Sequence, residues 1–124
     1  LHLSLRRQRQ MCIRDRIHAA DVVLVPSATE AWSRIVPESF AVGRPVVASA
    51  VGGLPEIVSP GRTGWLAAPG DVSGYADCIM QIRSHPQQAQ AIVTNAWAFA
   101  QANFRLDGKM FSTLEAYRRA AGGA

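Results

Sequence analysis

Short apolar runs alternate along the chain with segments that contain glycine, proline and acidic residues, most regularly between residues 21 and 67. The runs at 22–25 and 46–49 are continuous rather than alternating, and consist of valine, leucine, alanine and serine. A continuous run of this kind is typical of a strand that is covered on both faces, as in a parallel sheet. A third, shorter strand is predicted at 63–67, so the pattern favours a small parallel sheet.

Pro37 constrains the helix that connects the first two strands. Proline has no N–H group to donate and is well tolerated only in the first turn of a helix. The helix is therefore predicted to begin between Arg34 and Pro37 and to continue to Val42. Gly43 is the expected left-handed stop. Strand, helix and strand complete one βαβ unit by residue 49.

Other helices are predicted from apolar spacing and capping residues. Residues 17–20 are typical of the last turn of a helix, and Asp71 is placed to cap a helix over 72–84. The remaining predicted helices lie at 54–58, at 87–103 and from 107 onward. Three aromatic residues are assigned to the core: Trp65, Trp97 and Tyr117.

The composition is that of one compact domain. The chain has 124 residues, of which 48% are hydrophobic and 18% charged. This length allows one core but not two, and the composition argues against disorder. No apolar run approaches the roughly 18 to 20 residues needed to span a bilayer. Cys12 and Cys78 are too few for a disulfide framework or a metal site.

The formal charge of +4 lies in residues 1–16, which hold five arginines and one aspartate, whereas the remainder has eight basic and eight acidic residues. A basic arm would suit RNA, DNA or an acidic membrane. The alternative is a non-native origin, because the string MCIRDR resembles translated sequencing-adapter read-through. We interpret residues 1–16 as a non-native basic segment and exclude it from the fold. Because the rest of the chain is neutral, no nucleic-acid partner is expected.

Two glutamates flank the start of the helix that follows the first strand. Glu30 lies in the loop at the carboxyl end of that strand, where open α/β sheets place ligands, and Glu38 lies in the helix. A helix start carries unpaired N–H groups and a partial positive charge, which favour phosphate. Carboxylates cannot attract phosphate, but they accept hydrogen bonds from hydroxyl groups. The pattern predicts a ligand with both groups, such as a sugar nucleotide.

Four segments resemble the carboxyl-terminal domain of the group 1 glycosyltransferases, the retaining enzymes of the GT-B fold. They are Glu30 and Glu38 with seven residues between them, AVGRPVVAS, GGLPEIV and GRTGWL, in the family's order over residues 19–71. The resemblance implies an α/β, Rossmann-like, three-layer domain fragment with a short parallel sheet and C-terminal helices. Residues 17–124 are then the C-terminal part of the donor-binding domain, which is incomplete without the upstream part.

The resemblance also assigns roles to single residues. It implies that Glu30 is the catalytic residue, contacting donor-sugar hydroxyls near the reacting carbon, and that Glu38 accepts hydrogen bonds from the ribose. The distal phosphate is held by the backbone amides of Trp32, Ser33, Arg34, Ile35 and Val36. Gly52 and Gly53 either let the backbone approach the donor or serve only a tight turn.

The chain departs from the family at three positions. The family commonly has glycine where this chain has Ala31 and Ser33, and an apolar residue where it has Arg34. Ser33 is therefore expected either to adopt a positive φ or to cap the helix with its hydroxyl group. Arg34 either adds a phosphate contact or points to solvent.

Each acid also has a simpler interpretation. Glu30 could be a solvated loop acid, Glu38 could pair with an arginine, and Glu56 is interpreted as a helix-start acid rather than a ligand. Trp32 either lines the site or is buried for packing.

The resemblance implies transfer of a sugar from a nucleotide-diphosphate sugar, with retention by front-side attack and without a metal or cofactor. The family's acceptor domain and diphosphate-gripping basic pair lie upstream, so the missing N-terminal domain of the same parent chain is an expected partner and this chain alone is expected to be inactive. The parent is expected in the cytoplasm or at the inner membrane face. The nucleotide base, the donor sugar and the sugar, lipid or small-molecule acceptor are not specified by the sequence.

Two other functions are open on the residues alone. The first is a non-catalytic nucleotide-binding half-domain that acts by docking with a partner chain. The second is a nucleic-acid binder that uses the basic arm at 1–16, which ranks last because the rest of the chain has no charge excess.

Overall fold

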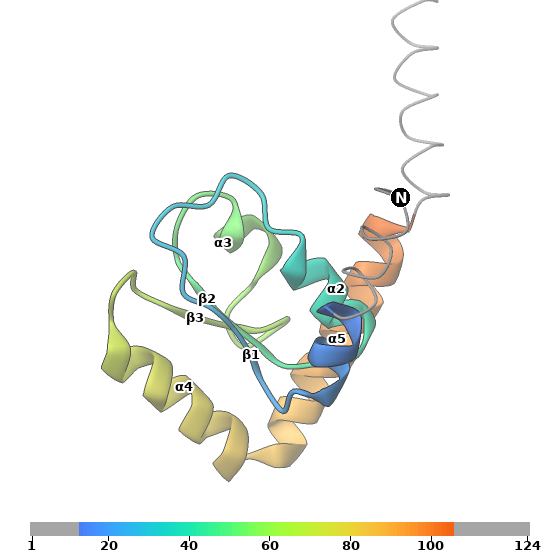
Figure 1. The fold of residues 1–124 in the computed structure, drawn as a ribbon. Coiled ribbons are helices and arrows are strands. Elements are labelled where there is room, and N and C mark those ends of the chain that lie inside the picture. Colours follow the sequence, from blue (N-terminus) through green and yellow to red (C-terminus); the bar gives the residue numbers. More distant parts are fainter. Residues whose placement is uncertain (1–12, 106–124) are drawn as a thin grey trace, which may run out of the picture.

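The computed structural model describes residues 13–105. Three parallel strands form one sheet in the order β1-β2-β3 (Figure 1). The strands are β1 (Val23–Val25), β2 (Val46–Ser49) and β3 (Trp65–Ala67). The predicted parallel sheet is confirmed, with each strand within two residues of its predicted bounds.

Helices connect and follow the strands as the sequence predicted. They are α2 (Ile35–Ala41), α3 (Leu54–Ile57), α4 (Val72–Ser84) and α5 (Pro86–Phe104), and residues 13–19 are also helical. The helix predicted from residue 107, with Tyr117, lies outside the described residues. No helix within 13–105 is both long enough and apolar enough to cross a membrane.

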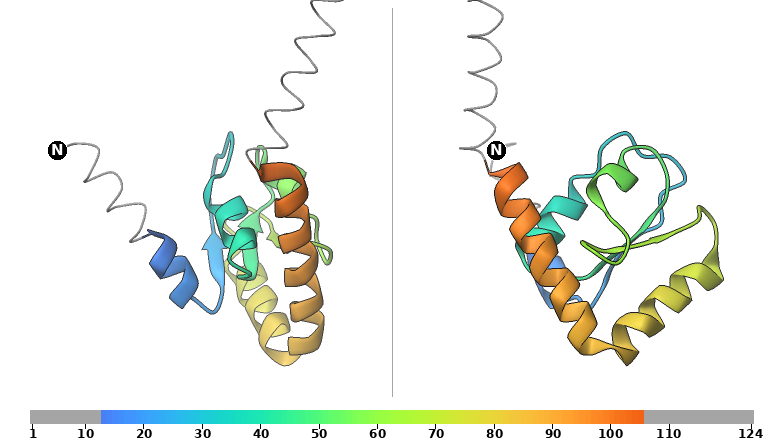
Figure 2. Two further views of the ribbon diagram at one scale, coloured as in Figure 1. Left: turned by 90° about the vertical axis from the view of Figure 1, so that its right-hand side faces the viewer. Right: turned by 180° about the vertical axis from the view of Figure 1, so that it is seen from behind.

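The sheet is the middle of three layers because the side chains of β2 alternate between two apolar clusters. Val46 and Ala48 belong to the cluster that α2 covers, whereas Val47 belongs to the cluster on the opposite face with Tyr75 of α4. Figure 1 shows α2 and α4 on opposite sides of the sheet, and Figure 2 shows α5 running alongside α2. All four residues of β2 are buried, as the continuous apolar run predicted.

The long helix α5 contributes to both clusters. Ala89 and Ile92 pack with the α4 side, and Ala96 and Ala100 pack with the α2 side. Small alanine side chains let the helix lie close to its neighbours. The core assignment of Trp97 is wrong, since its side chain is 48% exposed. Trp65 is buried as predicted.

Strand β1 is not covered on both faces, contrary to the prediction. Val23 and Val25 are buried, but Leu24 between them is 45% exposed. The physical reason is position: β1 is an edge of this sheet, and the helix on the Leu24 face, α4, packs against β2 and β3. The continuous apolar run therefore predicted the strand correctly but did not predict that one of its faces is exposed.

Two predicted helix boundaries are confirmed by their local geometry. Gly43 follows α2 with a φ of +69°. The Asp71 side chain accepts a hydrogen bond from the backbone N–H of Gly74 over 3.0 Å, which makes it the N-cap of α4. Donors from Gly74 and Ser73 hold the pKa of Asp71 below its usual value.

Candidate functional site

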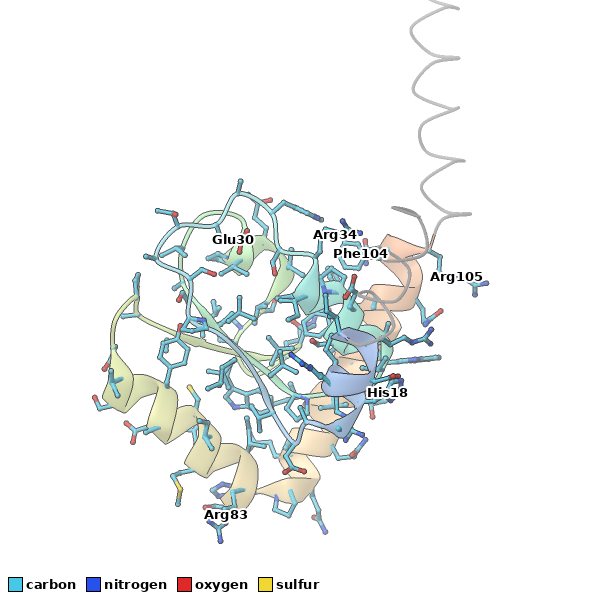
Figure 3. The ribbon with its side chains drawn as sticks, viewed as in Figure 1. His18, Glu30, Arg34, Arg83, Phe104 and Arg105 are labelled. Atoms are coloured by element: carbon cyan, nitrogen blue, oxygen red, sulfur yellow. The ribbon has the colours of Figure 1, made fainter. Side chains whose placement is uncertain are left out.

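The loop after β1 and the loop after β2 meet at one end of the sheet. The carboxyl ends of parallel strands lie at the same edge, so residues 26–34 and 50–53 come together there. Figure 1 shows both loops around α3, and Figure 3 shows Glu30 beside that helix. The sheet therefore brings Glu30, the start of α2 and the Gly52–Gly53 pair into one neighbourhood, as the family resemblance implied.

The backbone of the glycine pair touches the backbone of the Glu30 loop. The N–H of Gly53 donates to the carbonyl oxygen of Glu30 over 3.2 Å. A methyl group on Gly52 would overlap that same oxygen, and one on Gly53 would lie 2.6 Å from the carbonyl oxygen of Ala31. The close approach that these glycines permit is thus an approach to the protein's own loop. Contact between either glycine and a donor stays a prediction.

Glu30 is held partly by its own loop. Its side chain is half-buried, and Oε2 accepts a hydrogen bond from the Ser27 hydroxyl over 3.3 Å. A fully solvated loop acid would have neither feature. Ser27 was missed by the sequence analysis, which treated it only as the end of the first strand.

The start of α2 offers unpaired backbone donors. Arg34 is the N-cap residue, and no side chain caps the helix. At this helix start, the backbone N–H groups of Ser33, Arg34, Ile35 and Val36 have no hydrogen-bond acceptor among residues 13–105. Of these residues, Arg34 and Ile35 reach the surface, whereas Val36 is fully buried and Ser33 is 3% exposed.

Both expectations for Ser33 are wrong. No non-glycine residue among those described has a positive φ, so Ser33 takes an ordinary backbone conformation. Its hydroxyl does not cap α2, and the side chain is only 3% exposed. The small serine side chain is accommodated by burial rather than by a glycine-like turn. Arg34 is exposed at the N-cap position.

Glu38 lies in the first turn of α2 and is exposed. Its carboxylate forms no ion pair with an arginine in the described part of the chain, so the simpler interpretation of this acid finds no support there. Along the chain, Glu30 precedes the unpaired amides and Glu38 follows them, and both carboxylates have acceptor capacity available within the described residues. Such a site can bind a molecule that joins an anionic group to hydroxyl groups.

Trp32 connects this loop to the end of α5. Its ring is 49% exposed and meets the ring of Phe104 edge-on, with centroids 6.1 Å apart and planes at 67°. Phe104 in turn meets Phe99 edge-on at 5.7 Å and 74°. Trp32 is thus half-packed rather than buried. No sequence pattern indicated the two phenylalanines, because they lie about seventy residues away from Trp32 in the sequence.

No group of three or more histidine, cysteine, aspartate or glutamate side chains within 13–105 is arranged to hold a metal ion. Metal independence stays a prediction. Cys78 lies half-buried on α4, and burial, followed by the charges of Asp77 and Asp71, raises the pKa of its thiol.

Comparison with protein families gives a match over residues 5–85 to the family described as glycosyl transferases, group 1. Among curated proteins, a D-inositol 3-phosphate glycosyltransferase of Mycobacterium avium is 41% identical over 102 residues, which cover 82% of this chain and 24% of that protein. The chain thus spans about a quarter of the length of this relative.

Solved structures give the same result. A sucrose-phosphate synthase of Thermosynechococcus elongatus matches with a TM-score of 0.78 and 34% identity, over 88% of this chain and 27% of that one. The Anabaena protein HepE, solved in complex with UDP-glucose, matches with a TM-score of 0.77 and 30% identity, over 85% of this chain and 30% of that one. The predicted Rossmann-like α/β fragment of a GT-B protein is confirmed by these matches.

Proposed function

This chain belongs to the group 1 glycosyltransferases, and we propose that it forms the donor-binding part of a larger enzyme that transfers a sugar with retention of anomeric configuration. The donor is a nucleotide-diphosphate sugar. The proposal draws support from the structure of HepE with UDP-glucose, which is similar to this chain. The acceptor domain lies in the rest of the parent chain, and the present 124 residues alone do not catalyse transfer.

One observation carries this proposal: a row of four unpaired backbone N–H groups at the start of α2 lies between two glutamates. The N–H groups of Ser33 to Val36, together with that of Trp32, bind the distal phosphate. Glu38 accepts hydrogen bonds from the ribose hydroxyls. Glu30 accepts from donor-sugar hydroxyls near the reacting carbon, and its bond to Ser27 sets the direction of its carboxylate.

In this reaction an acceptor hydroxyl attacks the anomeric carbon on the same face as the leaving diphosphate. The new C–O bond forms as the bond to the diphosphate breaks, and a phosphate oxygen takes the acceptor proton. Negative charge grows on the leaving diphosphate, and the amides at the start of α2 stabilise it. No protein nucleophile, metal or cofactor takes part.

The experiment compares Glu38→Gln with Glu56→Gln in the full-length parent enzyme. Glu56 is the matched control because it is also an exposed acid in the first turn of a helix, α3. UDP and GDP are titrated separately by calorimetry. Loss of a charged acceptor costs about 1.5 to 3 kcal/mol, so Glu38→Gln should weaken binding of the preferred nucleotide at least about tenfold. Equal affinities in the two variants would refute the ribose role.

A second measurement addresses the reaction itself. Glu30→Gln should lower kcat and leave nucleotide affinity within about twofold, because UDP and GDP carry no donor sugar for it to contact. The anomeric configuration of the product, read by NMR early in the reaction, should equal that of the donor. An inverted product would refute retention, and a parent that binds nucleotide without transferring sugar would favour the non-catalytic half-domain.

A further inference from the structure

We propose that Gly52 and Gly53 are positioning residues that set the location of Glu30, rather than residues that contact the donor. This inference rests on the proposed function, which gives Glu30 its role at the donor sugar. It concerns how two segments that are twenty residues apart in the sequence hold one carboxylate in place.

The contact is made of backbone on both sides. The Gly53 N–H donates to the Glu30 carbonyl oxygen over 3.2 Å, so this amide is already used by the protein. Gly52 approaches the same carbonyl so closely that any side chain on it would overlap the oxygen. Figure 3 shows Glu30 against α3, the helix that begins directly after Gly53.

Backbone conformation explains why residue 52 is glycine but not why residue 53 is. Gly52 has a φ of +53°, which by itself favours glycine. Gly53 has φ −80° and ψ −5°, a conformation that any residue adopts. What excludes a side chain at Gly53 is the carbonyl oxygen of Ala31, 2.6 Å from where its Cβ would lie. The glycine is required by the approach of the Glu30 loop.

Other glycines of the chain show the contrast. Gly61 and Gly70 have φ values of +71° and +75°, and an added Cβ at either would meet nothing within 4 Å. The positive φ values of these two turns are sufficient to explain why glycine occurs there. Gly64 is crowded, but by Val58 and Val46 of the core rather than by the site. Only the pair at 52–53 among these glycines is crowded by the loop that carries a proposed site residue.

The consequence is specific. A methyl group on Gly53 must push residues 30–31 away, because the opposing atom is backbone and cannot rotate aside. Glu30 then moves with its loop, while the start of α2 and Glu38 keep their own contacts. Sugar transfer should therefore suffer without a matching loss of nucleotide binding.

The experiment measures kcat and UDP and GDP affinity in the full-length parent enzyme for Gly53→Ala, Glu30→Ala and the double variant. A displacement of about 1 Å at a reacting group costs about 100-fold in rate, which is the loss in kcat expected for Gly53→Ala. Nucleotide affinity should stay within twofold. Because the glycine acts through Glu30, the double variant should be no slower than Glu30→Ala alone.

Gly64→Ala is the matched control. It places a methyl group 2.8 Å from a Val58 carbon and 3.0 Å from the Val46 carbonyl oxygen, a comparable crowding in a different part of the molecule. Its folded fraction, measured by circular dichroism, corrects for general destabilisation. The kcat of its folded fraction should stay within about threefold of the parent.

The outcomes separate this inference from the proposed function. If Glu30→Ala leaves kcat unchanged, the proposed role of Glu30 is refuted. If Glu30→Ala lowers kcat but Gly53→Ala does not, or if their effects multiply in the double variant, only the positioning role is overturned. A fall in nucleotide affinity as large as the fall in kcat would instead make Gly53 a donor contact.

Hydrogen exchange provides a test that does not depend on any variant folding. In the unmodified 124-residue chain, the Gly53 amide should exchange more slowly than the Gly52 amide, since only the former has a hydrogen-bond acceptor in the described residues. Equal and rapid exchange at both would show that the loop is not held by this bond, and would overturn the inference.

Discussion

The hydroxyl group of Ser27 donates a hydrogen bond to Oε2 of Glu30 over 3.3 Å. This bond orients the carboxylate from within its own loop and leaves the other oxygen, Oε1, without a partner among residues 13–105. One oxygen is thus held by the protein and the other is available to a ligand hydroxyl. Glu30 thus has two attachments: its side chain is bonded to Ser27 in its own loop, and its carbonyl oxygen to Gly53 in the loop after β2.

Ser27→Ala should lower the kcat of the full-length enzyme about fivefold, because the bond is long and half-exposed and its loss corresponds to about 1 kcal/mol. Steady-state kinetics at saturating donor measures this. Ser73→Ala is the matched control, since its hydroxyl also donates to a carboxylate, that of Asp71, at a distance of 2.9 Å. The prediction fails if both variants have the same kcat.

Tyr75→Phe should lower the free energy of unfolding by about 1 to 3 kcal/mol, because it leaves the buried Ser49 hydroxyl without a partner. The Ser49 and Tyr75 oxygens are 2.5 Å apart, and both residues are buried where β2 meets α4. Urea denaturation of the 124-residue chain measures the change. Ser49→Ala combined with Tyr75→Phe should cost no more than Tyr75→Phe alone. If the double variant lost as much free energy of unfolding as the two single variants combined, this coupling would be contradicted.

The stability that Asp71 gives to α4 should depend on pH. Hydrogen bonds from Gly74 and Ser73 lower its pKa in the folded state below the unfolded value of 3.8. The carboxylate therefore stabilises the fold above that unfolded value, and the contribution is lost as pH falls through the folded pKa. Asp71→Asn, whose side chain still caps a helix, should differ in stability from the parent at pH 6, and this difference should shrink as the pH falls below 3.8.

Urea denaturation at several pH values from 6 to below 3.8 measures the Asp71 effect. Ser73→Ala removes one of the two donors and should show a smaller loss that follows the same pH dependence. A difference between Asp71→Asn and the parent that is constant with pH would mean that the charge has no part in the cap.

Cys78 should react with iodoacetamide more slowly than free cysteine at pH 8, because its raised pKa lowers the fraction of thiolate. Burial is the main cause, so mild urea that loosens α4 should accelerate the reaction. Asp77→Asn should accelerate it less, since it removes only the smaller electrostatic cause. The measurement uses a Cys12→Ser background, and a rate above that of free cysteine would contradict the prediction.

Much of the fold followed from patterns within a few residues. The bounds of α2 were predicted from Pro37 and Gly43, and the start of α4 from Asp71. These predictions succeeded because a missing N–H, a left-handed turn and a capping carboxylate act on their own neighbours. The candidate site was predicted in the same way as far as its parts are local: two acids and the start of the helix between them.

The predictions that failed concern which side chains other elements bury and how a whole loop sets the backbone conformation of one residue. Leu24 and Trp97 carry the apolar character of buried residues, yet both are about half exposed. Their exposure depends on where α4 and α5 lie against the sheet, which no local pattern encodes. The Ser33 predictions failed for a related reason, since its backbone conformation is set by the loop as a whole and not by the residue alone.

By itself, the sequence determined the strands, the helix ends and the identity of the acids, because these depend on residue type and on hydrogen bonds to near neighbours. Only the tertiary structure decided that Gly53 holds Glu30, that Phe104 meets Trp32 and that Tyr75 reaches Ser49. Each of these contacts joins segments separated by twenty or more residues. They form only when packing of helices on both faces of the sheet brings the loops and side chains to one place.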